Sequence, residues 1–130
     1  MMVSFTEKRA CSRFRIPEAL ISYQKIRLFG KRTDWIERSC HLYDLSRGGV
    51  RFLARESLAM GTKVYLELTY PNKQEPLRLS GIARWISEHE GGPFRFHVGV
   101  QFNPYGNRRK HNPVESLNKI IDLEKLYLKP

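Results

Sequence analysis

The sequence predicts a mainly β protein: a six-stranded antiparallel barrel followed by one C-terminal α-helix. Short segments in which apolar and polar residues alternate recur along the chain, separated by turns rich in Gly, Pro and charged residues. No helical pattern intervenes until the last part of the chain. Many short strands without helices between them are typical of antiparallel sandwiches and barrels. Closing six strands on themselves would remove the exposed sheet edges, which favours the barrel.

The first two strands are expected at residues 14–28 and 36–42. Pro17 would confine the start of the first strand to a sheet edge or a bulge, because proline cannot donate a ladder hydrogen bond. In the second strand, Cys40 is expected to face the core as a small apolar residue, while Glu37 faces solvent.

The other four strands are clearer because their alternation is stricter. They are expected, after a turn at Gly48-Gly49, at residues 50–54, 64–70, 77–85 and 96–102. In the segment 77–85 the alternation places Trp85 on the apolar face, so its plain role is that of a core residue.

A helix is expected near the C-terminus, after a polar linker at residues 103–112. Asn112, Pro113 and Glu115 suit the cap, first and third positions of a helix. The residues that follow make an apolar face too wide for a helix alone in water. This face consists of Leu117, Ile120, Ile121, Leu123, Leu126 and Tyr127. The helix is therefore expected to dock on the barrel or on another subunit.

These elements divide the chain into a flexible N-terminal arm (residues 1–12), a barrel (13–103) and a linker with the helix (104–130). A chain of 130 residues is one domain by length. No apolar stretch is long enough to span a membrane, and the N-terminus lacks the apolar run of a secretory signal. Two cysteines do not make a disulfide framework. We therefore expect a soluble, cytoplasmic protein.

The positive charge is concentrated in the first part of the chain. The formal net charge is +10, and residues 1–55 hold twelve Lys and Arg against five Asp and Glu. The remaining residues hold eleven against eight. A positive field in the first part would attract an anionic ligand and speed its binding. The plain alternative is a solvated basic surface, but this charge coincides with two motifs.

The two motifs carry side chains suited to an anionic guanine nucleotide. Lys8-Arg9-Ala10-Cys11-Ser12-Arg13 places two arginines four residues apart, and Asp44-Leu45-Ser46-Arg47-Gly48-Gly49 places a carboxylate, a hydroxyl and two glycines in an expected turn. Arginine can hold phosphate through two parallel hydrogen bonds, stack on a ring, or bond the O6 and N7 edge of guanine. A carboxylate can accept from guanine N–H groups, and glycine permits close approach of the backbone.

The order R-x-x-x-R followed by D-x-S-x-x-G resembles the PilZ domain, a bacterial receptor module for cyclic di-GMP. Gly81-Ile82-Ala83-Arg84-Trp85 and Val98-Gly99-Val100-Gln101-Phe102 resemble the later strands of that family, so the similarity extends from about Glu7 to the C-terminus. The resemblance implies a PilZ-type barrel that binds cyclic di-GMP. It also implies that the arm is loose without ligand and clamps the nucleotide against the Asp44–Gly49 turn. A partner protein would then read the new surface.

The resemblance assigns the main ligand contacts to Arg9, Arg13, Asp44, Ser46 and Gly49. Secondary contacts are expected from Lys8, Arg15, Gly48 and Trp85, the last by stacking on a guanine. Lys8 stands where the fuller family pattern has a further arginine. Because lysine keeps the charge but loses the fork, the number of ligand molecules stays open.

Each of these assignments has a plain alternative. The arginines could be solvated charges, and Asp44 and Ser46 could shape the turn through side-chain-to-backbone bonds. Gly49 is expected to serve the backbone, through positive φ or by admitting the ligand. Arg47, which is not a fixed letter of the motif, is expected to face solvent.

Other classes of function are less well supported by the sequence. None of the four histidines pairs with a cysteine at zinc spacing, and no nucleophile or phosphate-loop motif is present, so we expect no metal, no cofactor and no catalysis. Two alternatives to the receptor remain: a small barrel that binds nucleic acid, and a PilZ-like interaction module that does not bind nucleotide. The expected partners are cyclic di-GMP and an unidentified downstream protein, without membrane insertion, in a monomer or homodimer.

Overall fold

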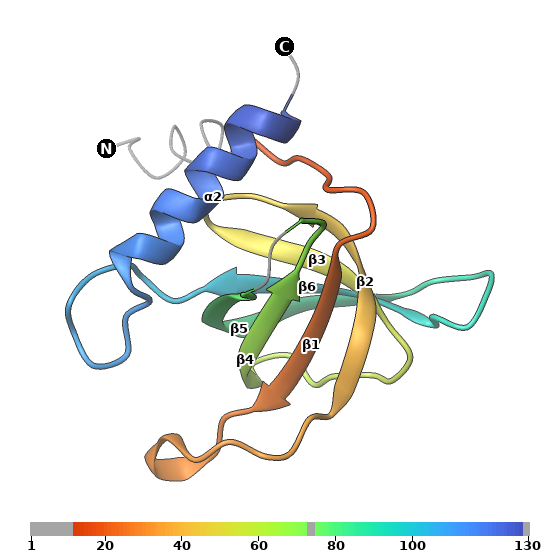
Figure 1. Ribbon diagram of the computed structural model, residues 1–130. Coiled ribbons are helices and arrows are strands. Elements are labelled where there is room, and N and C mark those ends of the chain that lie inside the picture. The colour runs from red at the N-terminus through yellow and green to blue at the C-terminus, as the bar shows by residue number, and fades with distance from the viewer. Residues whose placement is uncertain (1–11, 73–74, 129–130) are drawn as a thin grey trace, which may run out of the picture.

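The computed structural model, which describes residues 12–72 and 75–128, is a closed antiparallel barrel with one helix across its end (Figure 1). The strands are β1 (Leu20–Lys25), β2 (Glu37–Leu45), β3 (Gly49–Ala54), β4 (Lys63–Thr69), β5 (Leu77–Glu88) and β6 (Phe96–Phe102). A short 3-10 turn, η1 (Leu28–Gly30), follows β1, and the helix is α2 (Val114–Tyr127). The order around the barrel is β1-β2-β3-β6-β5-β4. The predicted six-stranded barrel with a C-terminal helix is confirmed.

The apolar residues of the strictly alternating segments point into the barrel and fill its core. Val64, Leu66 and Leu68 of β4 are buried, and they pack with apolar residues from the other strands. The two largest fully buried side chains are Tyr23 and Phe52, whose ring centroids lie 5.7 Å apart. Burial of these side chains supplies the main favourable free energy of folding.

The first strand is shorter than the alternation predicts. A turn at Pro17 and Glu18 separates Phe14, which makes an isolated bridge to Leu45, from β1, which begins at Leu20. Glu18 has φ 65°, a left-handed conformation that interrupts regular strand geometry. The expected strand at residues 14–28 is therefore two pieces joined by a turn, and its second piece ends at Lys25.

A bulge in β2 overturns the expectation that Glu37 faces solvent. Ile21 pairs with Cys40 and Tyr23 pairs with Glu37, so β2 holds one extra residue between these pairs. Ser39, with φ 61°, lies in this bulge. The extra residue reverses the parity of the strand. Glu37 and Cys40 consequently both point into the barrel.

The buried Glu37 carboxylate closes one end of the barrel. It accepts hydrogen bonds from the Tyr23 hydroxyl at 2.9 Å, from the Arg55 backbone N–H at 2.9 Å and from the Glu56 backbone N–H at 3.1 Å. These donors satisfy a charge that would otherwise be costly to bury. Burial and the Glu37 charge together raise the pKa of the Cys40 thiol to about 12, so the thiol stays protonated, as a small core residue does.

A second bulge overturns the core assignment of Trp85. Ala83 pairs with Val100, whereas Trp85 pairs with Gly99, which shifts the register of β5 against β6 by one residue. Beyond this bulge the parity of β5 is reversed. Trp85 therefore lies on the outer face of the barrel with 41% of its surface exposed.

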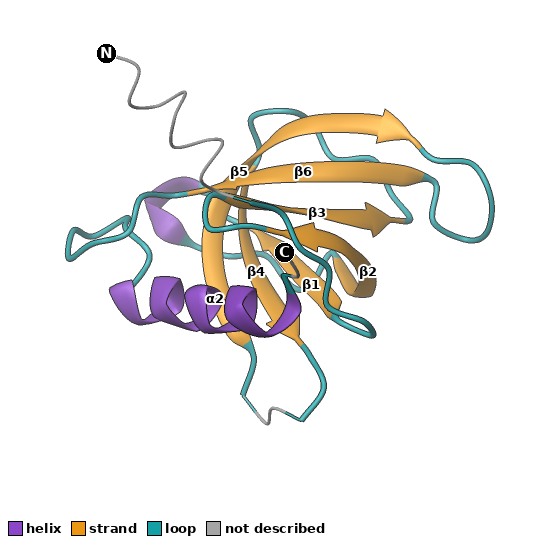
Figure 2. Cartoon of the chain, turned by 90° about the horizontal axis from the view of Figure 1, so that it is seen from above, coloured by secondary structure: helices purple, strands orange, loops and turns teal. Residues whose placement is uncertain are grey.

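Helix α2 lies across one end of the barrel and packs against β5 (Figures 1 and 2). Ser116, Ile120 and Leu123 are its buried residues, and the Ser116 hydroxyl donates to the Arg78 carbonyl of β5 at 3.3 Å. Docking on the barrel is thus confirmed, although Leu126 of the expected apolar face is exposed. In the described part of the chain, no helix has the length and apolar character needed to cross a membrane.

Asn112 does not cap the helix, because its side chain is used elsewhere. The buried amide accepts a hydrogen bond from Ser80 N at 2.8 Å and donates to Ser80 O at 2.9 Å and to Asn103 O at 3.1 Å. It therefore completes the backbone hydrogen bonding of β5 and holds the segment before α2 against the barrel.

Replacement of Asn112 by alanine should destabilise the fold. The change leaves the N–H and C=O groups of Ser80 without their side-chain partner, and we expect the free energy of unfolding to fall by about 2–3 kcal/mol. Chemical denaturation followed by circular dichroism measures this loss. Asn118→Ala, at an exposed position in α2, is the matched control and should change stability by less than about 0.5 kcal/mol. Equal effects at the two positions would contradict this role of Asn112.

Candidate functional site

The D-x-S-x-x-G segment forms the tight turn between β2 and β3. The Ser46 backbone N–H donates to the Gly49 carbonyl at 2.9 Å, and the buried Ser46 hydroxyl lies 3.3 Å from the Gly48 N–H, which donates to it. The Arg47 carbonyl accepts from the Tyr105 hydroxyl at 2.6 Å. In this structure the Ser46 side chain shapes the turn, as its plain alternative predicts. Its contact with ligand stays a prediction.

Gly49 is required by the packing of two strands. A Cβ atom on Gly49 would lie less than 3.0 Å from the carbonyl oxygen of Val100 in β6, where no real Cβ atom fits. Its φ is not positive, so close backbone approach is the reason for glycine here. Gly48, in contrast, has no atom within 4 Å of an added Cβ.

Asp44 is a buried carboxylate held by an arginine that the motif does not contain. Its side chain is 7% exposed, and it pairs with Arg51, directly opposite on β3. Arg51 Nε donates to the two carboxylate oxygens at 2.9 and 3.2 Å, and Arg51 Nη2 donates to Oδ2. This hydrogen bonding raises the pKa of Arg51 further above its ordinary value. Such a forked pair fixes the orientation of the guanidinium.

The structure brings Arg13 of the first motif to Asp44 of the second. Phe14 and Leu45 exchange two backbone hydrogen bonds of 2.9 and 2.8 Å, and buried Phe14 and Ile16 secure the segment on both sides of Arg15. Arg13 Nη1 then lies 3.4 Å from Asp44 Oδ1. Lys8 and Arg9, with the rest of residues 1–11, lie outside the described residues.

A row of residues crosses four strands on the outer face of the barrel. Asp44 of β2 pairs with Arg51 of β3, Arg51 with Gly99 of β6, and Gly99 with Trp85 of β5. Because Gly99 has no side chain, the Trp85 ring lies over it, with Cε3 3.2 Å from the position that a Cβ atom would take. The row thus joins the carboxylate of the motif to the exposed indole.

Aromatic rings and cations continue this row on both sides. Arg15 and Arg51 lie over the Tyr43 ring, at 4.2 and 5.1 Å from its centroid. The His97 ring stands edge-on to Tyr43 at 4.5 Å and to Trp85 at 4.9 Å. We call Arg13, Arg15, Tyr43, Asp44, Arg51, Trp85 and His97 the outer cluster.

His97 is the titratable ring of this cluster. Burial, followed by repulsion from Arg51, lowers its pKa below the ordinary 6.5. Its Nε2 atom is buried and has no hydrogen-bond partner among the described residues.

Arg47 is partly exposed, and it also pairs with the C-terminal helix. Arg47 Nη2 lies 2.7 Å from Glu124 Oε1 of α2, and Nε donates to the other oxygen at 3.4 Å. The turn of the second motif is therefore tied directly to the C-terminal helix. Sequence alone cannot show this pair because 77 residues separate its members.

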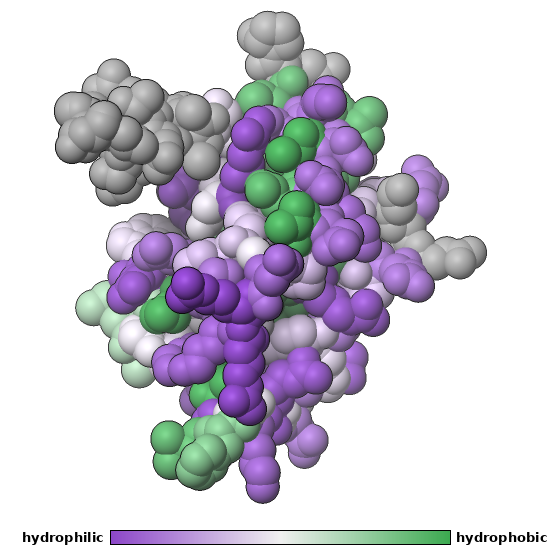
Figure 3. Space-filling view, turned by 90° about the vertical axis from the view of Figure 1, so that its left-hand side faces the viewer, coloured by the Kyte–Doolittle hydropathy of each residue, from purple (hydrophilic) through white to green (hydrophobic). Residues whose placement is uncertain are grey.

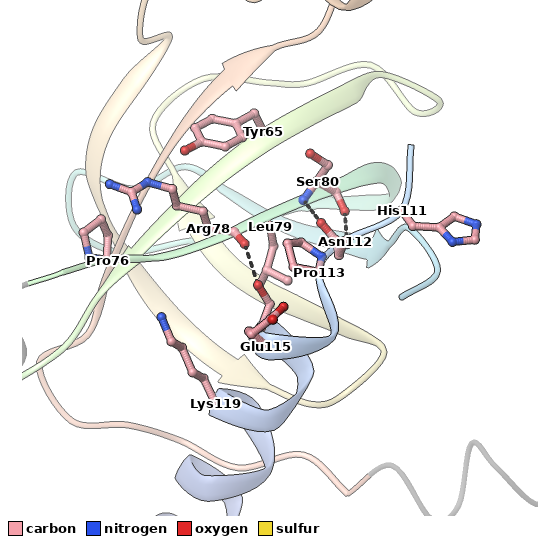
Figure 4. Close-up of a pocket in the computed structure, with 11 residues that line it drawn as sticks. Tyr65, Pro76, Arg78, Leu79, Ser80, His111, Asn112, Pro113, Glu115 and Lys119 are labelled. Carbon is pink, nitrogen blue, oxygen red and sulfur yellow. Dashed lines mark hydrogen bonds between the residues drawn. The ribbon is translucent and has the colours of Figure 1, made fainter. Parts of the chain in front are cut away.

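A hollow in the surface lies elsewhere on the molecule, away from the outer cluster. It measures about 480 Å³ and lies between β5 and the start of α2, lined by residues such as Tyr65, Arg78 and Lys119 (Figure 4). Figure 4 shows Asn112 turned toward Ser80 and the His111 ring turned away. Of the sequence-predicted ligand residues that the structure describes, none lines this hollow, so its size does not make it the candidate site.

The family assignment agrees with this arrangement. The family model of the PilZ domain matches residues 7–117, which include both motifs and all six strands. The chain belongs to the PilZ domain family. No significant match is found among the curated proteins.

One solved structure supports the fold of this PilZ domain. The chain is similar to the Bacillus subtilis inhibitor of motility (MotI/DgrA), with a TM-score of 0.55 and 13% sequence identity. The likeness covers 89% of this chain and 48% of that one, so the chain spans about half the length of that protein. At this identity the comparison shows a shared fold.

The PilZ motifs identify only part of the outer cluster. Of the predicted ligand residues, Arg13, Arg15 and Asp44 come together, Trp85 joins them through the row, and Ser46, Gly48 and Gly49 form the adjacent turn. Sequence analysis missed Arg51, Tyr43 and His97. Arg51 lies only two positions after Gly49, but the register of the hairpin, which the sequence does not reveal, is what places it beside Asp44.

The two glycines of the turn provide a matched test. Gly49→Ala should lower the free energy of unfolding by about 1–3 kcal/mol, because the new methyl group would force β3 away from Val100. Gly48→Ala should change it by less than about 0.5 kcal/mol, because open space surrounds that position. Thermal and chemical denaturation of both variants measure the difference. Equal stabilities would show that β3 and β6 do not approach so closely.

His97 should make stability depend on pH. Its pKa is lower in the folded state than in the unfolded one, so the unfolded state takes up a proton first as the pH falls. The contribution of His97 is complete above about pH 6.5 and is lost as the pH falls through the folded-state pKa. NMR titration of the ring should give a midpoint below 6.5, and His97→Gln should remove this part of the pH dependence. A midpoint at or above 6.5 would contradict the burial argument.

Proposed function

We propose that the protein is a receptor for cyclic di-GMP that binds the nucleotide on the outer cluster and signals to a partner protein. The observation that supports it most is that the fold joins the two PilZ motifs, placing Arg13 within 3.4 Å of Asp44. Neither motif alone would specify a site, whereas their contact provides phosphate-binding and guanine-binding groups together.

The charge of the outer cluster suits a ligand with two phosphates. The guanidinium groups of Arg13 and Arg51 bond the single Asp44 carboxylate, and that of Arg15 lies over the neighbouring Tyr43 ring. The cluster therefore carries an excess of positive charge, and Arg13 is only weakly engaged by Asp44. In the proposed complex Arg13 and Arg15 turn to phosphate, while Arg51 keeps Asp44 in place. Arg9, by the family motif, adds a further guanidinium.

The aromatic side of the cluster suits a purine. Trp85 packs against Gly99 and is still 41% exposed to solvent. Stacking of a base on an aromatic side chain typically contributes about 1–3 kcal/mol. In our proposal one guanine stacks on Trp85, and its N–H groups or its O6 and N7 edge meet Asp44 or an arginine.

The same turn offers a route to an output. Arg47 is bonded to Glu124, so a ligand that pulls on the turn changes the position or the charge pairing of α2. A change in α2, together with closure of the arm, would give the partner protein a new surface to bind. In this proposal the ligand is recognised and not chemically altered.

Loss of one arginine should weaken the ligand without unfolding the protein. Arg13→Ala is expected to weaken cyclic di-GMP binding at least tenfold, about 1.4 kcal/mol, because it removes a fork that holds phosphate. The Arg13 side chain is half exposed, so the melting temperature should barely change. Isothermal titration calorimetry measures the affinity, and Arg9→Ala should behave in the same way.

The matched control is Arg108→Ala, an exposed arginine in the loop before α2, which should bind as the parent does. A single-stranded oligonucleotide should compete poorly with cyclic di-GMP. Parental affinity in both Arg9→Ala and Arg13→Ala would place the site elsewhere. Oligonucleotide binding that falls steeply with salt, with no binding of cyclic di-GMP, would favour the nucleic-acid alternative.

A further inference from the structure

The loop between β1 and β2 carries, at its protruding tip, two neighbouring apolar side chains that are almost fully exposed. Leu28 is 81% exposed and Phe29 is 96% exposed, the largest values for any large apolar residue described. Single exposed apolar side chains are common on protein surfaces, but an adjacent pair at a loop end is a candidate for an interaction. We call Leu28 and Phe29 the apolar tip.

The backbone holds the apolar tip outward. Arg27 N donates to Lys31 O at 2.6 Å, Gly30 N donates to Arg27 O at 3.1 Å, and an isolated bridge joins Ile26 to Arg32. Phe29 itself has φ 61° and ψ 24°, a left-handed conformation that is unusual for a bulky residue. Asparagine or glycine would adopt it more easily. A phenylalanine that is both strained and exposed does not stabilise the fold, so the stability of the fold does not explain its presence.

Basic residues flank the apolar tip on both sides along the loop. Residues 25–32 hold Lys25, Arg27, Lys31 and Arg32 and no acidic residue. We call these four residues the basic collar. Arg32 is held in place by the Tyr65 ring, 3.9 Å from its centroid. A fifth basic residue, Lys63, begins β4 and accepts a backbone hydrogen bond from Ile26. Such a collar is complementary to a negatively charged surface.

The tip is small and convex, which decides between the possible acidic surfaces. Two side chains cannot supply the roughly 800 Å² per partner of a stable protein interface, and they would need a matching pocket. A bilayer needs no pocket, because its acyl boundary accepts Leu and Phe while its anionic headgroups meet Lys and Arg.

We propose that the apolar tip and the basic collar form a peripheral docking site for the surface of a bilayer that contains anionic phospholipid. Leu28 and Phe29 enter the boundary between headgroups and acyl chains, and the collar contacts the lipid phosphates. The chain does not cross the bilayer. This site is independent of the proposed nucleotide site.

The position of the tip leaves the other end of the molecule free. In Figure 1, η1 lies at the lower end, whereas α2 and the turn between β2 and β3 lie at the upper end. Figure 3 shows apolar atoms gathered at this lower end, with hydrophilic atoms around and above them. A protein docked through the tip would therefore present α2 and the turn between β2 and β3 away from the lipid.

Vesicle sedimentation tests the proposal with the full chain and without nucleotide. Vesicles of phosphatidylcholine alone are compared with vesicles in which roughly 30% is replaced by phosphatidylglycerol. The parent should bind the anionic vesicles at least about tenfold more tightly than the neutral ones. Leu28→Gln/Phe29→Asn should lose at least about tenfold of that affinity, as should Arg27→Gln/Lys31→Gln. Thermal unfolding verifies that each variant is folded, which is expected because these positions are exposed.

Matched controls separate docking at the tip from general adsorption of a basic protein. Met60→Gln removes another exposed apolar side chain, and Arg108→Gln/Arg109→Gln removes an exposed basic pair in the loop before α2. Both should bind anionic vesicles as the parent does, within about twofold. Equal binding of the parent and the tip variant would overturn the proposal. So would an equal loss in the Arg108/Arg109 control, or a parent that binds an acidic protein but no vesicles. Because no nucleotide is present, these outcomes do not bear on cyclic di-GMP.

Discussion

The bond between Asp44 and Arg51 organises the outer face of this PilZ domain. A carboxylate that is 7% exposed must be paired, and the register of β2 and β3 provides Arg51 directly opposite. Once fixed by its bonds to Asp44, the Arg51 guanidinium lies over the Tyr43 ring, and its charge adds to the burial that lowers the pKa of His97. Arg13 reaches the same carboxylate from the segment before β1. Loss of the pair would leave three cations without an organising anion.

Much of the fold was predictable because alternation and turn residues act locally. Residues 64–70 and 96–102 correspond closely to β4 and β6, and the docking of the C-terminal helix was expected from its apolar face. The two errors about which face a side chain takes lie where a strand gains one residue. Bulges near Ser39 and before Trp85 reverse which face a side chain takes, and so Glu37 is buried while Trp85 is exposed. No residue type announces a bulge, since the sheet as a whole decides where the extra residue is accommodated.

The sequence predicted only those residues of the candidate site that lie within one short motif. Asp44, Ser46 and Gly49 could be recognised by spacing, although the structure gives Gly49 a packing role against Val100. Arg51 meets Asp44, and Gly99 meets Trp85, through pairing between strands that depends on register shifts between Leu42 and Asp44 and between Ala83 and Trp85. The His97 ring contacts Trp85 from the neighbouring strand. The bond between Arg47 and Glu124 depends on the docking of α2. These contacts follow from tertiary structure and leave no pattern along the chain.

The two tryptophans of the chain occupy two different environments, and this has a practical consequence. Trp85 lies in the outer cluster beside His97. Trp35 lies between η1 and β2, where its ring centroid is 6.3 Å from that of Tyr65 and the Arg38 guanidinium lies over its ring. Each indole therefore serves as an intrinsic fluorophore for its own region. A Trp35→Phe protein would emit only from the outer cluster, and a Trp85→Phe protein only from the base of the β1–β2 loop. Events at the two regions become optically separable without any attached dye.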